Sequence, residues 1–140
     1  LDTIIDAGAD IITIHQESTT RLYSCIEKIK SRGVKAGVVL SPATNEDTLK
    51  YVLDKIDMIL LMTINPGEAG PGFHEELLTK IKNVRELIGD RDIDLEVDGG
   101  IDNTNIAKCK EAGVNVFVSG GYVFKGDIAE KIKTLREALK

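Results

Sequence analysis

The segment Ile93-Asp94-Leu95-Glu96-Val97-Asp98-Gly99-Gly100-Ile101 carries the pattern from which the fold can be inferred. Its first half predicts a buried strand over 93–97, and the strand ends on a carboxylate followed by two glycines. An aspartate at the mouth of an apolar strand is costly to desolvate unless it is paired or bound to a metal. The two glycines would let a ligand approach the backbone closely. We therefore expect Asp98 to be a functional residue. By strand alternation Glu96 shares its face, so Glu96 should need a polar partner there.

The same succession of strand, polar turn and helix recurs along the chain. Apolar, β-branched runs predict strands over 11–14, 34–40, 58–62, 93–97 and 114–118. Apolar residues at helical spacing predict helices over 18–31, 44–54, 74–88, 103–112 and 127–139, with Thr44 and Asp47 capping the second of them. No hairpin signal interrupts the pattern, and the strands are apolar throughout, which is typical of a parallel sheet. Both a (β/α)₈ barrel and an open doubly wound sheet fit this repeat.

Polar and glycine-rich residues follow every predicted strand. In parallel folds the functional residues lie at the carboxyl ends of the strands. The residues at these ends are His15, Ser41-Pro42, Met62 with the 65–72 loop, Asp98-Gly99-Gly100, and Ser119-Gly120-Gly121. We expect them to form one rim, with the 65–72 loop as a lid over it.

Two features of this rim predict specific ligands. His15 ends an apolar strand, and a neutral imidazole there suits Zn, Fe or Mn. The second histidine, His74, is expected to be a solvated residue at a helix start. The glycine pairs 99–100 and 120–121 follow consecutive strands, and their backbone N–H groups could bind a phosphate between the last two strands.

Composition excludes several classes of function. The chain has 140 residues and a formal net charge of -5, which argues against a nucleic-acid partner. No apolar run is long enough to span a membrane, so we expect no membrane partner. Cys25 and Cys109 form no CxxC pattern and are expected to be reduced thiols of a cytoplasmic protein. We expect residues 1–140 to form a single domain that begins inside a longer fold.

Two longer motifs resemble a known family. Leu60-Leu61-Met62-Thr63-Ile64-Asn65-Pro66-Gly67, followed by Gly70 and Phe73, is similar to the signature of the ribulose-phosphate (pentose-5-phosphate) 3-epimerases. The segment 95–101 matches the second hallmark of that family, and 35–37 with 41–44 is similar to it as well. The resemblance covers essentially the whole chain. The allulose-6-phosphate 3-epimerases are close relatives, and Thr63 and Ala69 lean slightly toward them.

The resemblance implies the last five βα units of a (β/α)₈ barrel, in a homo-oligomeric, cytoplasmic enzyme of the pentose phosphate pathway. It implies a divalent metal ion (Zn, Fe, Mn or Co) held by His15 and Asp98, with Asp98 also one of two acid/base carboxylates. The metal would assist 3-epimerisation of D-ribulose 5-phosphate to D-xylulose 5-phosphate through an enediolate. The small phosphosugar substrate would contact Met62, Gly67, Glu68, Ala69, Gly70, Gly99, Gly100, Gly120 and Gly121.

The sequence also departs from the family. Glu68 stands where the family usually has Phe, Pro71 where it has Gln, and Gly121 where it has Ser. We expect about three N-terminal strands to be missing, and with them the second catalytic Asp and further metal ligands. The chain of 140 residues is therefore expected to be inactive alone.

Three alternatives remain at this point. The first is a phosphate-binding barrel of the orotidine-decarboxylase or hexulose-phosphate-synthase type, although 92–98 lacks the lysine of the Asp-x-Lys-x-x-Asp cluster. The second is a non-catalytic barrel remnant that self-associates through an exposed sheet edge. The third is an open flavodoxin-like sheet with a regulatory Asp98.

Overall fold

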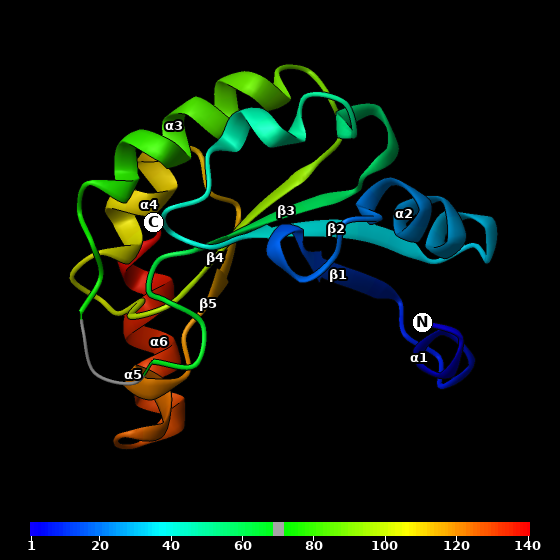
Figure 1. Ribbon diagram of the computed structural model, residues 1–140. Helices are drawn as coiled ribbons and strands as arrows, with labels where there is room; N and C mark the ends of the chain where they lie inside the picture. The colour runs from blue at the N-terminus through cyan, green and yellow to red at the C-terminus, as the bar shows by residue number, and fades with distance from the viewer. Residues whose placement is uncertain (69–71) are drawn as a thin grey trace.

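A single parallel sheet organises the chain in the computed structural model, which describes residues 1–68 and 72–140 (Figure 1). Its strands are paired in sequence order, β1-β2-β3-β4-β5, and every neighbouring pair is parallel. The strands are β1 (Ile11–His15), β2 (Lys35–Leu40), β3 (Met58–Met62), β4 (Asp94–Asp98) and β5 (Val116–Val118). All five predicted strands are thus confirmed, with ends that differ by one or two residues.

Helices connect the strands and cover the convex side of the curved sheet (Figure 1). The α-helices are α1 (Asp2–Asp6), α2 (Leu22–Ser31), α3 (Leu77–Ile88), α4 (Ile106–Ala112), α5 (Gly121–Phe124) and α6 (Ile128–Ala138). Short 3₁₀ turns form η1 (Gln16–Ser18), η2 (Glu46–Leu49) and η3 (Leu53–Lys55). Helix α5 was not predicted. In the described part of the chain, no helix has the length and apolar character needed to cross a membrane.

The predicted α-helix over 44–54 is wrong. This stretch forms the separate turns η2 and η3, and its N-cap is Asn45, whose side chain accepts from the Asp47 N–H at 2.7 Å. The Thr44 side chain makes no cap bond here, and its hydroxyl donates to Glu17. The spacing of three between the buried Leu49 and Val52 suits a 3₁₀ turn as well as an α-helix, so periodicity could not separate the two.

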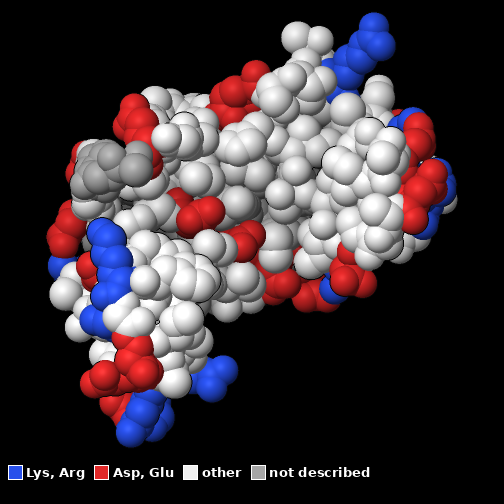
Figure 2. Space-filling model, turned by 90° about the horizontal axis from the view of Figure 1, so that it is seen from below, with Lys and Arg blue, Asp and Glu red and all other residues white. Residues whose placement is uncertain are grey.

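The two faces of the sheet differ in what covers them. On β3 and β4 the side chains of Ile59, Leu61, Leu95 and Val97 are at most 2% exposed and lie under the helices. The alternate residues point to the concave side, where Asp94, Glu96 and Asp98 of β4 are half-buried. Figure 2 shows the molecule from below, where the concave side opens, with acidic side chains near the middle of the view.

Strand order and helix placement decide between the two architectures. A flavodoxin-like sheet has the order 2-1-3-4-5 and carries helices on both faces. Here the order is sequential, and the main helices follow one face of a curved sheet. The chain therefore forms an arc of a (β/α)₈ barrel, consisting of five consecutive βα units, and the flavodoxin-like alternative is wrong.

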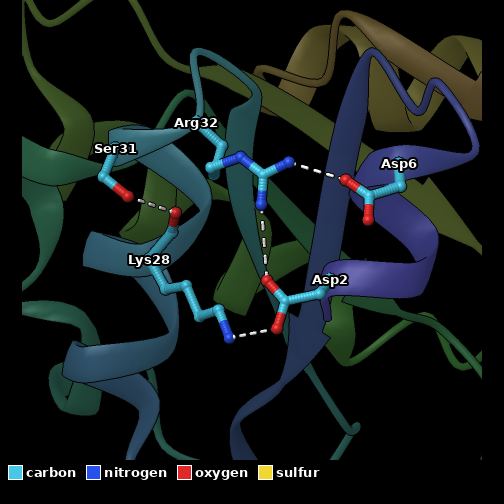
Figure 3. Close-up of polar contacts among 5 residues, drawn as sticks. All are labelled: Asp2, Asp6, Lys28, Ser31 and Arg32. Carbon is cyan, nitrogen blue, oxygen red and sulfur yellow. Dashed lines mark hydrogen bonds and ion pairs between the residues drawn. The ribbon is translucent and has the colours of Figure 1, made fainter.

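Helix α1 is held to helix α2 by surface ion pairs (Figure 3). Lys28 Nζ lies 2.6 Å from Asp2 Oδ2, and the Arg32 guanidinium lies 3.4 Å from Asp2 and 2.6 Å from Asp6. All four side chains are largely exposed, so solvent screens the pairs and each contributes little to stability. Their effect is to fix where α1 lies beside the first strand.

A hydrogen-bonded carboxylate, that of Glu17, links the carboxyl ends of β1 and β2. Glu17 Oε1 accepts from the Ser41 N–H at 2.7 Å and from the Thr44 hydroxyl. Lys80 of α3 donates to the carbonyls of Ser41 and Pro42 at 2.9 and 3.1 Å. Burial opposes ionisation of Glu17, but the two hydrogen bonds outweigh it and lower the pKa of Glu17 to about 2. One carboxylate thus joins successive loops at the rim.

We predict that Glu17→Gln destabilises the protein at neutral pH and that the loss disappears in acid. The folded-state pKa of Glu17 is about 2 and its ordinary value is 4.5, so its stabilisation is complete above pH 4.5 and is lost as the pH falls through 2. Since the side chain is 36% exposed, we discount the effect for solvent screening and expect about 1 kcal/mol. Urea unfolding from pH 7 to pH 2 measures it.

The exposed residue Glu111 provides the control, because Glu111→Gln should leave the stability curve unchanged. A Glu17→Gln variant as stable as the wild type at pH 7 would contradict the assignment. A difference that persists undiminished to pH 2 would contradict it equally.

Candidate functional site

Three predicted site residues lie on the concave face at the carboxyl ends of their strands. In the sheet register Met62 is paired directly with Asp98, so these side chains are neighbours on one face. His15 is paired with Val39, which is paired in turn with Leu60. Strand alternation therefore places His15 on the same face as Asp98. It lies level with Glu96, two residues before Asp98 along the strands.

His15 and Asp98 are separated along the sheet by β2 and β3. Three strand spacings correspond to about 14 Å along the sheet, and curvature shortens the direct path. The His15 Nδ1 lies 3.6 Å from the Glu17 carboxylate, so the ring is flanked by the residue that joins the β1 and β2 loops. The structure therefore brings Met62 and Asp98 side by side and places His15 farther along the same rim.

The Asp98 carboxylate is half-buried and has no hydrogen-bond donor or cation beside it within the described ranges. Burial raises the pKa of Asp98 above its ordinary value. A carboxylate with a raised pKa accepts protons more readily, and its free oxygens can face a ligand. Asp98 therefore has the properties of a general base.

Glu96 lies one step below Asp98 on the same face, as strand alternation predicted. Burial raises the pKa of Glu96 most, and the neighbouring carboxylates of Asp98 and Asp94 raise it further. The polar partner expected for Glu96 is not found among the residues that the structure describes. Its surroundings are instead acidic, which favours the protonated form of its side chain.

Hydrogen bonds from Thr63, the residue after β3, hold the backbone carbonyls of Asp98 and Gly99. The Thr63 N–H donates to the Asp98 carbonyl at 2.8 Å, and the Thr63 hydroxyl donates to the Gly99 carbonyl at 2.5 Å. Thr63 is fully buried, with 0% of its surface exposed. Sequence reasoning did not assign this role to Thr63. The available signal was a polar residue directly after a wholly apolar strand.

The next two carbonyls of the turn also accept from side chains. Asn105 Nδ2 donates to the Gly100 carbonyl at 2.8 Å, and Ser119 Oγ donates to the Ile101 carbonyl at 2.7 Å. Asn105 is only 6% exposed, and this hydrogen bond satisfies its buried amide. These bonds join the ends of β3, β4 and β5 at one turn, and sequence reasoning missed this contribution of Asn105 and Ser119.

The two glycine pairs have different physical reasons for lacking side chains. Gly99 (φ +127°) would place a Cβ 2.6 Å from Ile64 Cγ1, and Gly100 (φ +66°) would place one 2.9 Å from the Phe73 nitrogen. Close backbone packing therefore requires both glycines. Around Gly120 and Gly121 a Cβ would meet no described atom within 4 Å. This second pair, at the start of α5, borders open space.

The remaining predicted substrate contacts lie in the loop after β3. Gly67 adopts φ +81°, which favours glycine, and Glu68 accepts a hydrogen bond from Asn65 at 3.3 Å. The predicted contacts Ala69 and Gly70 lie outside the described residues, together with Pro71. The function of the 65–72 loop as a lid stays a prediction.

The donor set for a metal ion is incomplete within residues 1–68 and 72–140. No group of three or more His, Cys, Asp or Glu side chains there could hold a metal ion. His15 and Asp98 have suitable donor atoms and share a face and a rim. They could supply part of a ligand set but not the whole of one.

Known enzymes have the same fold. A 3-hexulose-6-phosphate synthase structure aligns with a TM-score of 0.78 at 24% identity, covering 99% of this chain and 66% of that one. A 3-keto-L-gulonate-6-phosphate decarboxylase from Vibrio cholerae O1 biovar El Tor str. N16961 aligns with a TM-score of 0.76 at 20% identity, covering 96% and 63%. At these identities the likeness shows the fold alone.

Sequence comparison identifies closer relatives. The ribulose-phosphate 3-epimerase of Serratia marcescens is 48% identical over 120 residues, which cover 84% of this chain and 57% of that protein. The ribulose-phosphate 3-epimerase of Escherichia coli (strain K12) is 43% identical over 136 residues, covering 95% and 60%. The chloroplastic ribulose-5-phosphate-3-epimerase of Arabidopsis thaliana is 43% identical over 137 residues, covering 94% and 49%.

Together these comparisons show the family of the chain. The chain spans roughly half to three-fifths of the length of these three relatives. The model of the Ribulose-phosphate 3 epimerase family matches residues 1–124, which include His15, Met62, Asp98 and both glycine pairs. The chain therefore belongs to the ribulose-phosphate 3-epimerase family.

Proposed function

We propose that this chain supplies one half of a two-base active site that epimerises D-ribulose 5-phosphate at carbon 3 to D-xylulose 5-phosphate. The observation that carries the proposal is the Asp98 carboxylate. It is half-buried and has a raised pKa, and it stands beside Met62 at the carboxyl end of β4. The names of the relatives supply the reaction, and the geometry supplies a group able to move a proton.

The reaction inverts a carbon that lies next to a ketone. One base removes the carbon 3 proton to give an enediolate, and a second acid returns a proton to the opposite face. Asp98 would act on one face, because its raised pKa makes its carboxylate a stronger base. The half-buried Met62 would form an apolar wall beside it that limits water access.

We further propose a divalent metal ion (Zn, Fe, Mn or Co), with His15 and Asp98 among its ligands. The donor types fit, since imidazole and carboxylate both bind such ions, and Glu17 beside His15 could orient the ring. The ion would polarise the ketone oxygen and lower the cost of the developing negative charge. Further ligands would have to come from outside the described residues.

The phosphate would bind at the glycine turns after β4 and β5. Gly100 is exposed, and its carbonyl is occupied by Asn105, which leaves the backbone of this turn fixed. Gly120 and Gly121 border open space. Backbone N–H groups at such turns bind anions and would fix the far end of the substrate. Gly67 and Glu68 would contact the substrate from the loop after β3.

An allulose 6-phosphate substrate is the second candidate, because it would undergo the same inversion. Thr63 was one of two residues that leaned toward it. In the structure Thr63 is fully buried behind the turn, so it cannot contact the sugar. The identity of Thr63 therefore does not separate the two substrates, and both belong in the assay.

We predict that the purified chain of 140 residues epimerises neither phosphosugar at a measurable rate, whichever of the four metals is added. The second carboxylate that the reaction needs is not expected among residues 1–140. In contrast, a chimera that joins the N-terminal part of the Escherichia coli relative to this chain should be active. In that chimera Asp98→Asn should lower kcat about 10²- to 10⁴-fold. A coupled assay measures both.

Measurable epimerisation by the chain alone would contradict the division of the active site. A chimera that stays active with Asp98→Asn would contradict the proposed role of Asp98. The matched control is Asp102→Asn in the same chimera. The Asp102 side chain accepts a hydrogen bond from the Thr104 N–H, and this change should leave kcat unchanged.

We predict that Asp98→Asn and His15→Gln each weaken Co²⁺ binding by at least about tenfold, since each would remove a ligand. Titration followed by the visible Co²⁺ spectrum gives the dissociation constants. His74→Gln is the matched control, because the His74 side chain is 43% exposed and its Nδ1 lies 3.7 Å from Glu76. If His15→Gln binds Co²⁺ as tightly as His74→Gln does, His15 is not a ligand.

We also propose that the chain forms a homo-oligomer through its sheet edges. Among the described residues β1 and β5 are the outer strands, each paired on one side only. Ile11 and Val118 are 38% and 36% exposed on them, and the nearby Phe124 is 76% exposed. Unpaired edges flanked by apolar side chains favour association. Light scattering should show a dimer or larger species, and a monomer with a cooperative thermal transition would overturn this proposal.

A further inference from the structure

We infer that Thr63 is a positioning residue, which holds the Asp98-Gly99-Gly100 turn so that the Gly100 N–H faces the anion side of the site. This inference rests on the proposed function, because it names what orients the proposed phosphate donor. Thr63 is 0% exposed, so its side chain has no accessible surface with which to contact a substrate. It acts through the backbone of the turn.

Four consecutive carbonyls of the turn accept hydrogen bonds from within the protein. The carbonyls of residues 98, 99, 100 and 101 accept, in order, from the Thr63 N–H, the Thr63 hydroxyl, Asn105 Nδ2 and Ser119 Oγ, at 2.8, 2.5, 2.8 and 2.7 Å. All four bonds are made within the protein, and three of them come from side chains. Two of the four donors belong to Thr63.

The geometry of the peptide unit relates the Gly99 carbonyl to the Gly100 N–H. In a planar trans peptide the C=O and the N–H of the next residue point in opposite directions. The chain has no cis peptide bond among its described residues, so the Gly99 carbonyl, fixed on the buried Thr63 hydroxyl, turns the Gly100 N–H away from Thr63. Gly100 is exposed whereas Gly99 is buried. The hydroxyl of Thr63 therefore sets the direction of an exposed N–H.

The buried Thr63 side chain lies directly against the turn. A Cβ on Gly99 would lie 3.0 Å from Thr63 Oγ1 and 2.7 Å from the Ile64 nitrogen. Loss of the hydroxyl would leave the Gly99 carbonyl buried without its donor, which is costly. The peptide that joins Gly99 to Gly100 would then be expected to rotate.

The test compares Thr63→Val, which keeps the shape and removes the hydroxyl, with Thr63→Ser, which keeps the hydroxyl. Two quantities are measured by NMR on the purified chain: the Gly99 carbonyl ¹³C shift, and the dissociation constant of inorganic phosphate from the Gly100 amide shift. We expect Thr63→Val to move the carbonyl shift and to weaken phosphate binding about tenfold. Thr63→Ser should keep both near their wild-type values.

Two control variants separate positioning from general stability. Ile59→Val removes a methyl group from a fully buried residue of β3 and should lower the melting temperature without changing either quantity. Thr134→Val removes a hydroxyl that donates to the Glu130 carbonyl on the remote helix α6 and should change neither. If Ile59→Val weakens phosphate binding as much as Thr63→Val, the role of Thr63 is only structural and the inference is overturned.

The outcomes also separate this inference from the proposed function. If the wild-type chain shows no phosphate-dependent shift at Gly100, the proposed anion site is wrong, and the Gly99 carbonyl shift alone decides the inference. An unchanged Gly99 carbonyl shift in Thr63→Val overturns the inference in either case. A changed shift that Thr63→Ser restores supports it.

Discussion

The hydrogen bond from the Thr63 N–H to the Asp98 carbonyl extends the pairing of β3 with β4 one step past the last paired residues. The remaining geometry of the rim depends on this bond. It fixes where β4 ends and therefore which residue, Asp98, stands at its mouth. It also brings the Thr63 hydroxyl to the Gly99 carbonyl, so that the turn begins in a defined direction. Parallel pairing thus determines both the position of the carboxylate and the path of the glycine pair after it.

The concave face has an electrostatic character that follows from this placement. Asp98, Glu96 and Asp94 lie on one face of β4, and burial raises the pKa of both Asp98 and Glu96. Three carboxyl groups in a row would repel one another if all were ionised, so protonation or a bound cation relieves the site. At the other end of the rim Glu17 behaves in the opposite way, because hydrogen bonds hold its pKa at about 2. Environment, and not residue type, therefore raises the pKa of Asp98 and Glu96 and lowers the pKa of Glu17.

Much of the fold could be predicted because apolar strands and amphipathic helices each have a characteristic period. All five strands and most helices follow from it. The stretch 44–54 could not be assigned correctly, since the Thr44 hydroxyl binds Glu17, which is 27 residues distant in sequence. Among the candidate site residues, the positions of Met62 and Asp98 side by side depend on the register of β3 and β4, which periodicity cannot provide. The roles of Asn105 and Ser119 depend in the same way on long-range contacts with the turn.

The sequence by itself determined the alternation of strands and helices, the family resemblance carried by 60–67 and 95–101, and the choice of Asp98 as the central polar residue. These are local properties, set by side-chain period and by residues that adjoin in the chain. Only the tertiary structure decided that the sheet is an arc of a barrel, that Gly99 and Gly100 are required by packing against Ile64 and Phe73, and that Thr63 fixes the turn. The physical reason is that strand order, register and burial arise from contacts between residues far apart in the chain, which no local pattern encodes.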